Sequence, residues 1–126
     1  MLRLSLIISS LLQLTTLCSA QVSLAPYAGK WESEEDVKNR LVITDKTIVE
    51  LYGTNVIDTF LFTITYQACD TGFKPTTAAD SAVVFLYETS LHQGHTYCYQ
   101  VLRCDDEQLV LLFTHNEYEA VFRRRK

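Results

Sequence analysis

The 126-residue sequence contains none of the short motifs by which the common enzyme classes are recognised. It has no G-x-S-x-G nucleophile elbow, no H-E-x-x-H helix motif and no glycine-rich loop to cradle phosphate. Paired carboxylates occur only in turn segments such as Asp105-Asp106, where they favour the turn rather than acid–base chemistry. Every candidate catalytic group has a simpler role, so we expect a protein that is not an enzyme.

Basic residues are scarce. The chain has 11 Lys and Arg against 15 Asp and Glu, a formal net charge of −4. Proteins that bind nucleic acid present a basic stripe to the phosphates, so we expect no nucleic-acid partner. The exception is the basic cluster at residues 123–126, which is typical of a solvated strand end.

An uninterrupted apolar run of membrane-spanning length is also absent, since a span needs roughly 20 such residues. Residues 1–20 instead have the pattern of a signal peptide: Arg3 near the start, a mostly apolar run from Leu4 to Leu12, and small residues at Ser19 and Ala20 before the cut. We expect a secreted or periplasmic protein, not an integral membrane protein. Its mature domain would be a single unit over residues 21–126.

No segment shows a sustained helical period. The apolar runs are short, rich in Val, Ile, Thr, Phe and Tyr, and separated by Asp, Asn or Gly, which is typical of strands in a meander. The connectors of two or three residues permit only antiparallel hairpins. Strands are predicted at Tyr27 to Glu32, Lys38 to Thr44, Thr47 to Tyr52, Val56 to Tyr66, Ser81 to Glu88, His95 to Arg103, Gln108 to Thr114 and Tyr118 to Arg124.

Alternation within these strands predicts how the sheet is arranged. In the fourth strand Phe60, Phe62 and Ile64 fall on one face, while threonines occupy most of the other. About eight one-sided strands can hide their apolar faces by closing on themselves, which also removes both edges. The predicted fold class is all-β, a single up-and-down antiparallel β-barrel. A two-sheet β-sandwich would bury the same faces and is the alternative.

The two ends of the mature chain carry residues found together in one known group. An early strand contains Gly29-Lys30-Trp31 and the last strand contains arginine. With eight meandering strands, this resembles the calycin superfamily, in particular the short lipocalin-like domains of exported bacterial proteins. The resemblance implies that Gly29 lets the first strand bend at the closed end of the barrel, and that the Trp31 side chain fills that end. It also implies that an arginine of the last strand lies across the indole ring. Alternation with Phe122 selects Arg124 for that role.

The inferred inner face is strongly aromatic. A barrel of eight strands is either filled by its side chains or holds one small ligand, and aromatic walls suit apolar ligands with a few polar anchors. We expect a small apolar or amphipathic ligand and no cofactor. The residues predicted to bind it are Phe60, Phe62, Tyr66, Phe85, Tyr97 and Tyr99.

A second function remains open on the same sequence. A barrel filled by its own rings would have no ligand cavity and would serve as a rigid interaction protein, such as an inhibitor or an envelope component. Its partner would bind the two longer connections, residues 67–80 and 89–94, through an apolar patch that includes Phe73 and Leu91.

Three cysteines remain after removal of the leader. An odd number in an oxidising compartment predicts one bridge and one free thiol. Cys69 and Cys104 fall at the same end of the predicted meander, so we predict that they form the disulfide. Cys98 and Cys104 lie six residues apart on one strand, too far for a bond, and Cys98 is expected to be a small buried hydrophobe.

Histidines offer no convincing metal site. His92 and His95 flank Gln93-Gly94, but a zinc site needs three or four protein ligands and no third lies nearby. His115 stands in a different turn. We predict no metal site.

Overall fold

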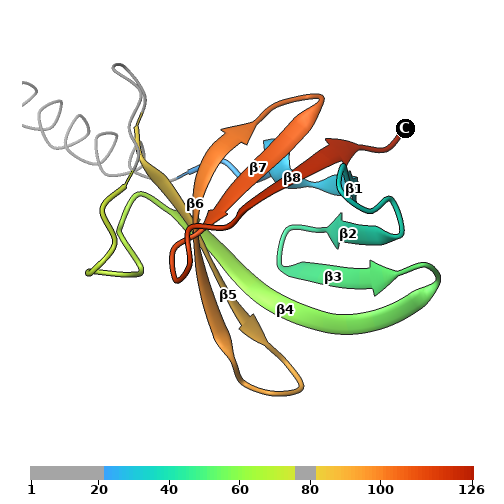
Figure 1. The fold of residues 1–126 in the computed structure, drawn as a ribbon, viewed down its shortest axis with the longest axis horizontal. Coiled ribbons are helices and arrows are strands. Elements are labelled where there is room, and N and C mark those ends of the chain that lie inside the picture. The colour runs from blue at the N-terminus through green and yellow to red at the C-terminus, as the bar shows by residue number, and fades with distance from the viewer. Residues whose placement is uncertain (1–21, 76–81) are drawn as a thin grey trace, which may run out of the picture.

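Short turns join each strand of this chain to the next, and the last strand returns to the first. In the computed structural model, which describes residues 22–75 and 82–126, eight antiparallel strands form a closed barrel in sequence order (Figure 1). The strands are β1 (Gly29–Ser33), β2 (Asn39–Ile43), β3 (Thr47–Tyr52), β4 (Asn55–Thr65), β5 (Val84–Ser90), β6 (Thr96–Cys104), β7 (Gln108–Phe113) and β8 (Glu119–Arg124), preceded by the short 3-10 helix η1 (Ala25–Tyr27).

This architecture confirms the predicted fold class and excludes the two-sheet sandwich. The predicted leader, residues 1–20, lies outside the described residues, as do residues 76–81 of the longest connection. Within the described ranges, no helix has the length and apolar character needed to cross a bilayer.

One end of the barrel, here called the floor, is closed by Trp31, Arg124 and η1. Trp31 is 0% exposed, and its indole N–H donates to the Tyr27 carbonyl at 2.9 Å. The Arg124 guanidinium lies 4.1 Å from the centroid of the indole ring and donates to the carbonyls of Ala28 and Pro26 at 2.8 and 2.7 Å. The floor therefore joins β1 to β8 through side chains as well as backbone pairing.

Gly29 is required for this arrangement. Its φ of +136° is a conformation that other residues rarely adopt, and a Cβ there would stand 2.7 Å from Arg124 Nη1. The absence of a side chain thus lets the guanidinium lie along the start of β1.

The half of the barrel next to the floor is filled by apolar side chains. Cross-strand partners such as Ile64 and Leu86, or Leu109 and Phe122, bring these residues onto the same inner face. The packed set includes Leu41, Ile43, Ile48, Phe62, Ile64, Leu86, Leu109, Leu111 and Phe122. Burial of these apolar side chains stabilises the barrel.

One predicted inward residue lies on the other face. Phe85 alternates with Leu86, and Leu86 is the residue that pairs with Ile64 and Tyr99 on the inner face. Phe85 is buried, but on the outside of the barrel. The sequence prediction was wrong here because Val84, Phe85 and Leu86 are all apolar, so alternation alone gave no orientation.

Candidate functional site

The open end of the barrel, opposite Trp31, is here called the mouth. Because the strands alternate in direction, this end collects the last residues of the odd-numbered strands and the first residues of the even-numbered ones. Ser33 on β1, Asp58 on β4, Ser90 on β5 and Tyr97 on β6 all lie there, as their cross-strand partners require. The mouth is the part of the interior that the apolar core does not fill.

A cavity of about 340 Å³ opens at the mouth. Its inner wall is the top of the packed core, formed by Leu41, Ile48 and Phe122. The lining also contains the aromatic residues Phe60, Tyr97 and Tyr99 and the acidic residues Glu50, Asp58 and Glu88. We call this the mouth cavity; its walls combine apolar, aromatic and acidic side chains.

Three different strands position the carboxylates. Glu50 on β3 and Asp58 on β4 are direct cross-strand partners. Glu88 on β5 stands opposite Tyr97 of β6. Ser90 holds Asp58 in place, since its hydroxyl lies 2.7 Å from Asp58 Oδ2 and donates to it.

Sequence reasoning missed these three carboxylates and wrongly confined paired acids to turns. The signal was available, because each acid lies two residues from an inward apolar residue on its own strand: Ile48 for Glu50, Phe60 for Asp58 and Leu86 for Glu88. Asp105 does have the turn role expected of it, because its Oδ1 accepts from the backbone N–H groups of Glu107 and Gln108, each at 2.8 Å.

Burial changes the protonation of this cluster. Glu88 is 7% exposed, and desolvation raises its pKa to about 7, opposed by a hydrogen bond with Tyr99 and reinforced by the negative charges of Glu50 and Asp58. Burial, followed by the charge of Asp58, also raises the pKa of Glu50. The pKa of the Tyr99 hydroxyl rises as well, first through burial and then through Glu88.

The six residues predicted to bind a ligand divide between several places. Phe60, Tyr97 and Tyr99 line the mouth cavity. Phe62 belongs to the packed core, one step closer to the floor. Tyr66 lies beyond the end of β4 with 49% of its surface exposed. Phe85 faces outward as described above. The structure therefore brings three of the six together at one cavity.

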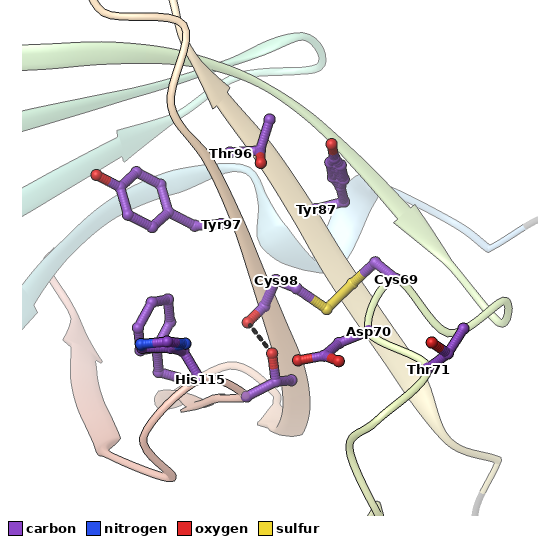
Figure 2. Close-up of a pocket in the computed structure, with 10 residues that line it drawn as sticks. Cys69, Asp70, Thr71, Tyr87, Thr96, Tyr97, Cys98 and His115 are labelled. Atoms are coloured by element: carbon purple, nitrogen blue, oxygen red, sulfur yellow. Dashed lines mark hydrogen bonds between the residues drawn. A yellow bond between two sulfur atoms is a disulfide. The ribbon is translucent and has the colours of Figure 1, made fainter.

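A second, more open depression of about 530 Å³ lies outside the barrel wall, beside β5 and β6 (Figure 2). Tyr87, Thr96 and His115 line it together with the disulfide and the segment that follows it. Thr114 Oγ1 lies 3.1 Å from the Cys98 carbonyl and donates to it. This depression has the larger volume but is more open to solvent than the mouth cavity.

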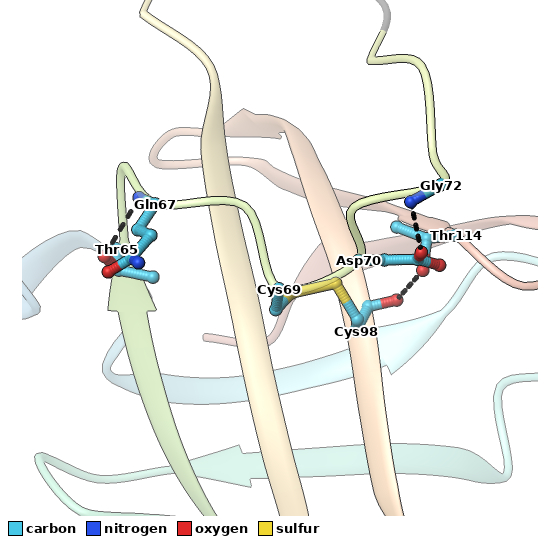
Figure 3. Close-up of a disulfide and its surroundings, with 7 residues drawn as sticks. All are labelled: Thr65, Gln67, Cys69, Asp70, Gly72, Cys98 and Thr114. Atoms are coloured by element: carbon cyan, nitrogen blue, oxygen red, sulfur yellow. Dashed lines mark hydrogen bonds between the residues drawn. A yellow bond between two sulfur atoms is a disulfide. The ribbon is translucent and has the colours of Figure 1, made fainter.

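The disulfide joins Cys69 to Cys98, with 5.8 Å between their Cα atoms, and Cys104 is free (Figure 3). The predicted Cys69–Cys104 pairing was wrong. A bulge between Val101 and Arg103 shifts the register of β6 against β7, so Cys98 faces outward whereas Cys104 faces the core. Cys69 reaches Cys98 because the chain leaving β4 passes β5 to meet β6. Cys104 instead contacts the floor, with its Sγ 3.4 Å from the Pro26 carbonyl.

Among residues 22–75 and 82–126, no group of three His, Cys, Asp or Glu side chains converges as a metal site would require. His92 and His95 thus have no third ligand in this part of the chain. The mouth carboxylates are likewise not arranged around a metal ion.

No protein-family model matches the chain, and neither a curated protein nor a solved structure matches it. The fold and the site define a closed all-β barrel with a plugged floor and an acidic, aromatic cavity at its mouth.

Proposed function

We propose that this chain is an exported, lipocalin-like barrel that binds one small amphipathic ligand in the mouth cavity. The observation that carries this proposal is the cavity itself: about 340 Å³ of space in a barrel whose opposite end is closed. That volume lies within the range of roughly 300–1,000 Å³ typical of small-ligand pockets.

The walls favour a ligand with one apolar and one polar end. Leu41, Ile48 and Phe122 offer an apolar surface to the cavity, and Phe60 packs edge-on against Tyr97 with 6.0 Å between ring centroids. The carboxylates of Glu50, Asp58 and Glu88 line the same cavity. Such a division of apolar walls and a few polar anchors gives orientation to a bound molecule.

Two further features support the proposed relationship and compartment. The floor contacts among Gly29, Trp31 and Arg124 are those that the calycin resemblance implies. The Cys69–Cys98 disulfide is a bond that persists in oxidising compartments, which supports export.

A neutral fluorescent probe, N-phenyl-1-naphthylamine, tests the proposal. It should bind saturably to the mature protein. Ala120 lines the cavity, so Ala120→Phe should reduce this binding by filling the space. Val121→Phe is the matched control, because the neighbouring residue points to the opposite face of β8. Native mass spectrometry of the protein from its own source should also detect a bound small molecule. Absence of both a co-purified molecule and saturable probe binding would overturn the proposal.

The interaction-protein alternative rests on exposed apolar residues at the mouth, of which Leu91 is 54% exposed. Its two marker residues do not share a contact surface: Phe73 lies beside the β7–β8 turn with His115, whereas the Leu91 N–H donates to Thr59 of β4. A partner captured by the native protein and lost from a Phe73→Ala, Leu91→Ala double variant would favour this alternative over ligand binding.

A further inference from the structure

The mouth cavity is unusual in its charge. Its described lining contains three carboxylates, Glu50, Asp58 and Glu88, and no lysine, arginine or histidine. The ion pairs among the described residues all lie elsewhere: Arg103–Asp105, Arg123–Glu34 and Arg125–Glu32. Among the described residues, none of these three carboxylates forms an ion pair with a basic side chain.

Glu88 is the group for which this imbalance matters most. It is more than nine-tenths buried and lines the cavity. The one partner shown for it is the neutral Tyr99 hydroxyl, through a hydrogen bond. A buried carboxylate without a cationic partner destabilises a fold. A glutamate at this position opposes stability, and such local conflicts are characteristic of functional sites.

The aromatic residues beside the carboxylates also favour a cationic ligand. Phe60, Tyr97 and Tyr99 line the cavity alongside the acids, and the negative faces of aromatic rings attract cations. Because the described acids do not converge as metal ligands, an organic cation fits better than a metal ion.

We infer that the mouth cavity selects a small organic ammonium ion with an apolar body. This inference rests on the proposed ligand-binding function and adds the ligand class. The apolar body contacts Leu41, Ile48 and Phe122, and the ammonium group contacts the carboxylates that line the cavity. Charge-assisted hydrogen bonds from the ammonium to Glu88 and its neighbours supply the selectivity.

Binding of such a ligand is linked to protons. The titratable groups that face Glu88 are Tyr97 and Tyr99 from β6, Glu50 from β3 and Asp58 from β4; β2 and β8 contribute apolar residues to the cavity. Because the pKa of Glu88 is raised to about 7, the Glu88 carboxyl is protonated in a fraction of the molecules at neutral pH. An ammonium ligand favours the ionised form, so its affinity rises between pH 6 and 8 and its binding releases protons.

The test compares three probes of similar shape by isothermal titration calorimetry at pH 8: 2-phenylethylamine, 2-phenylethanol and 3-phenylpropanoate. We expect the amine to bind at least ~10-fold more tightly than the alcohol, and the carboxylate to bind most weakly. Similar affinities for amine and alcohol would overturn the ammonium preference while leaving ligand binding intact. No binding of any probe, together with no binding of N-phenyl-1-naphthylamine, would overturn both.

Two isosteric variants localise the effect. Glu88→Gln should weaken amine binding by ~10-fold or more and weaken alcohol binding by a much smaller factor, since the amide keeps an accepting oxygen but loses the charge that favours the ammonium ion. Glu50→Gln should act in the same direction and gives a second, independent variant. Glu119→Gln is the control because Glu119 is exposed on β8 and outside the cavity lining. Unchanged amine affinity in both cavity variants would overturn the inference.

Discussion

Replacing Glu88 with glutamine should make the barrel more stable at high pH but not at low pH. Glu88 has a folded-state pKa of about 7 against an ordinary value of 4.5. Between these values the unfolded chain loses its proton while the folded protein keeps it. Stability contributed by this group is therefore fully present below pH 4.5 and is lost as the pH rises through 7. The full change corresponds to about 3 kcal/mol of unfolding free energy.

The glutamine side chain does not ionise, and its amide oxygen can still accept the hydrogen bond from the Tyr99 hydroxyl. We therefore expect Glu88→Gln to match the wild type at pH 4.5 within about 0.5 kcal/mol and to exceed it by up to about 3 kcal/mol at pH 8. Glu50 titrates in both proteins, so its raised pKa largely cancels in the difference. Asp105, whose pKa is lowered to about 2, also titrates in both proteins, so its contribution to the difference in unfolding free energy cancels.

Urea-induced unfolding measures this difference at pH 4.5, 6, 7 and 8. Trp31 is the chain's only tryptophan and is fully buried, so its fluorescence reports unfolding of the barrel directly. A difference in unfolding free energy that stays constant from pH 4.5 to 8 would show that Glu88 is not desolvated. A variant that becomes less stable than the wild type at pH 8 would show that its charge is compensated.

Three other perturbations address the floor and the disulfide. Gly29→Ala should lower stability by about 1–3 kcal/mol, because alanine is strained at this positive φ and its Cβ meets the Arg124 guanidinium. Arg124→Met should lower stability by about 2 kcal/mol through loss of the indole contact and the carbonyl hydrogen bonds, measured by the same urea titration. Peptide mapping without reductant should find Cys69 linked to Cys98. Replacing both with serine should lower stability by about 3.6 kcal/mol, for a bond that spans 29 residues. Cys104 should react with iodoacetamide rapidly only after denaturation, because burial raises its pKa to about 11.

Matched controls accompany these variants. Gly72→Ala should change stability by less than about 0.5 kcal/mol, since a Cβ there meets nothing closer than 3.7 Å. Arg123→Met should be similarly mild because that side chain is 65% exposed. Equal losses in Arg123→Met and Arg124→Met would contradict the assigned role of Arg124. A Cys69–Cys104 peptide, or rapid alkylation of native Cys104, would contradict the observed bridge.

The barrel could be predicted from the sequence because the features that specify it, alternation within each strand and short connectors between strands, lie close together along the chain. Thr47 to Tyr52 was predicted with the observed bounds, and the alternation of Phe60, Phe62 and Ile64 matches the inner face of β4. Short connectors left antiparallel neighbours as the available arrangement. Closure then followed from the need to bury one face of every strand.

The cysteine pairing could not be predicted because it depends on a non-local irregularity. The bulge between Val101 and Arg103 reverses which face Cys104 presents, and no residue type in that stretch announces it. The inward position of the carboxylates, unlike the cysteine pairing, could have been predicted. Glu50 and Glu88 each lie two residues from an apolar residue on the same strand, and residues two apart on a strand face the same side. They were missed because charged residues are normally assigned to the solvent face.

The floor also joins the last strand, β8, to the segment that leads into the first strand, β1. Arg124 reaches back to carbonyls 96 and 98 positions earlier in the chain, so the contacts that seal the barrel connect its most distant segments. Such contacts carry the largest chain-closure entropy, which makes sealing a late event in folding. Until β8 docks, β1 and β7 are open edges able to recruit strands from other molecules. Because they form late, the Arg124 contacts slow reopening of the closed β1–β8 seam rather than its first closure.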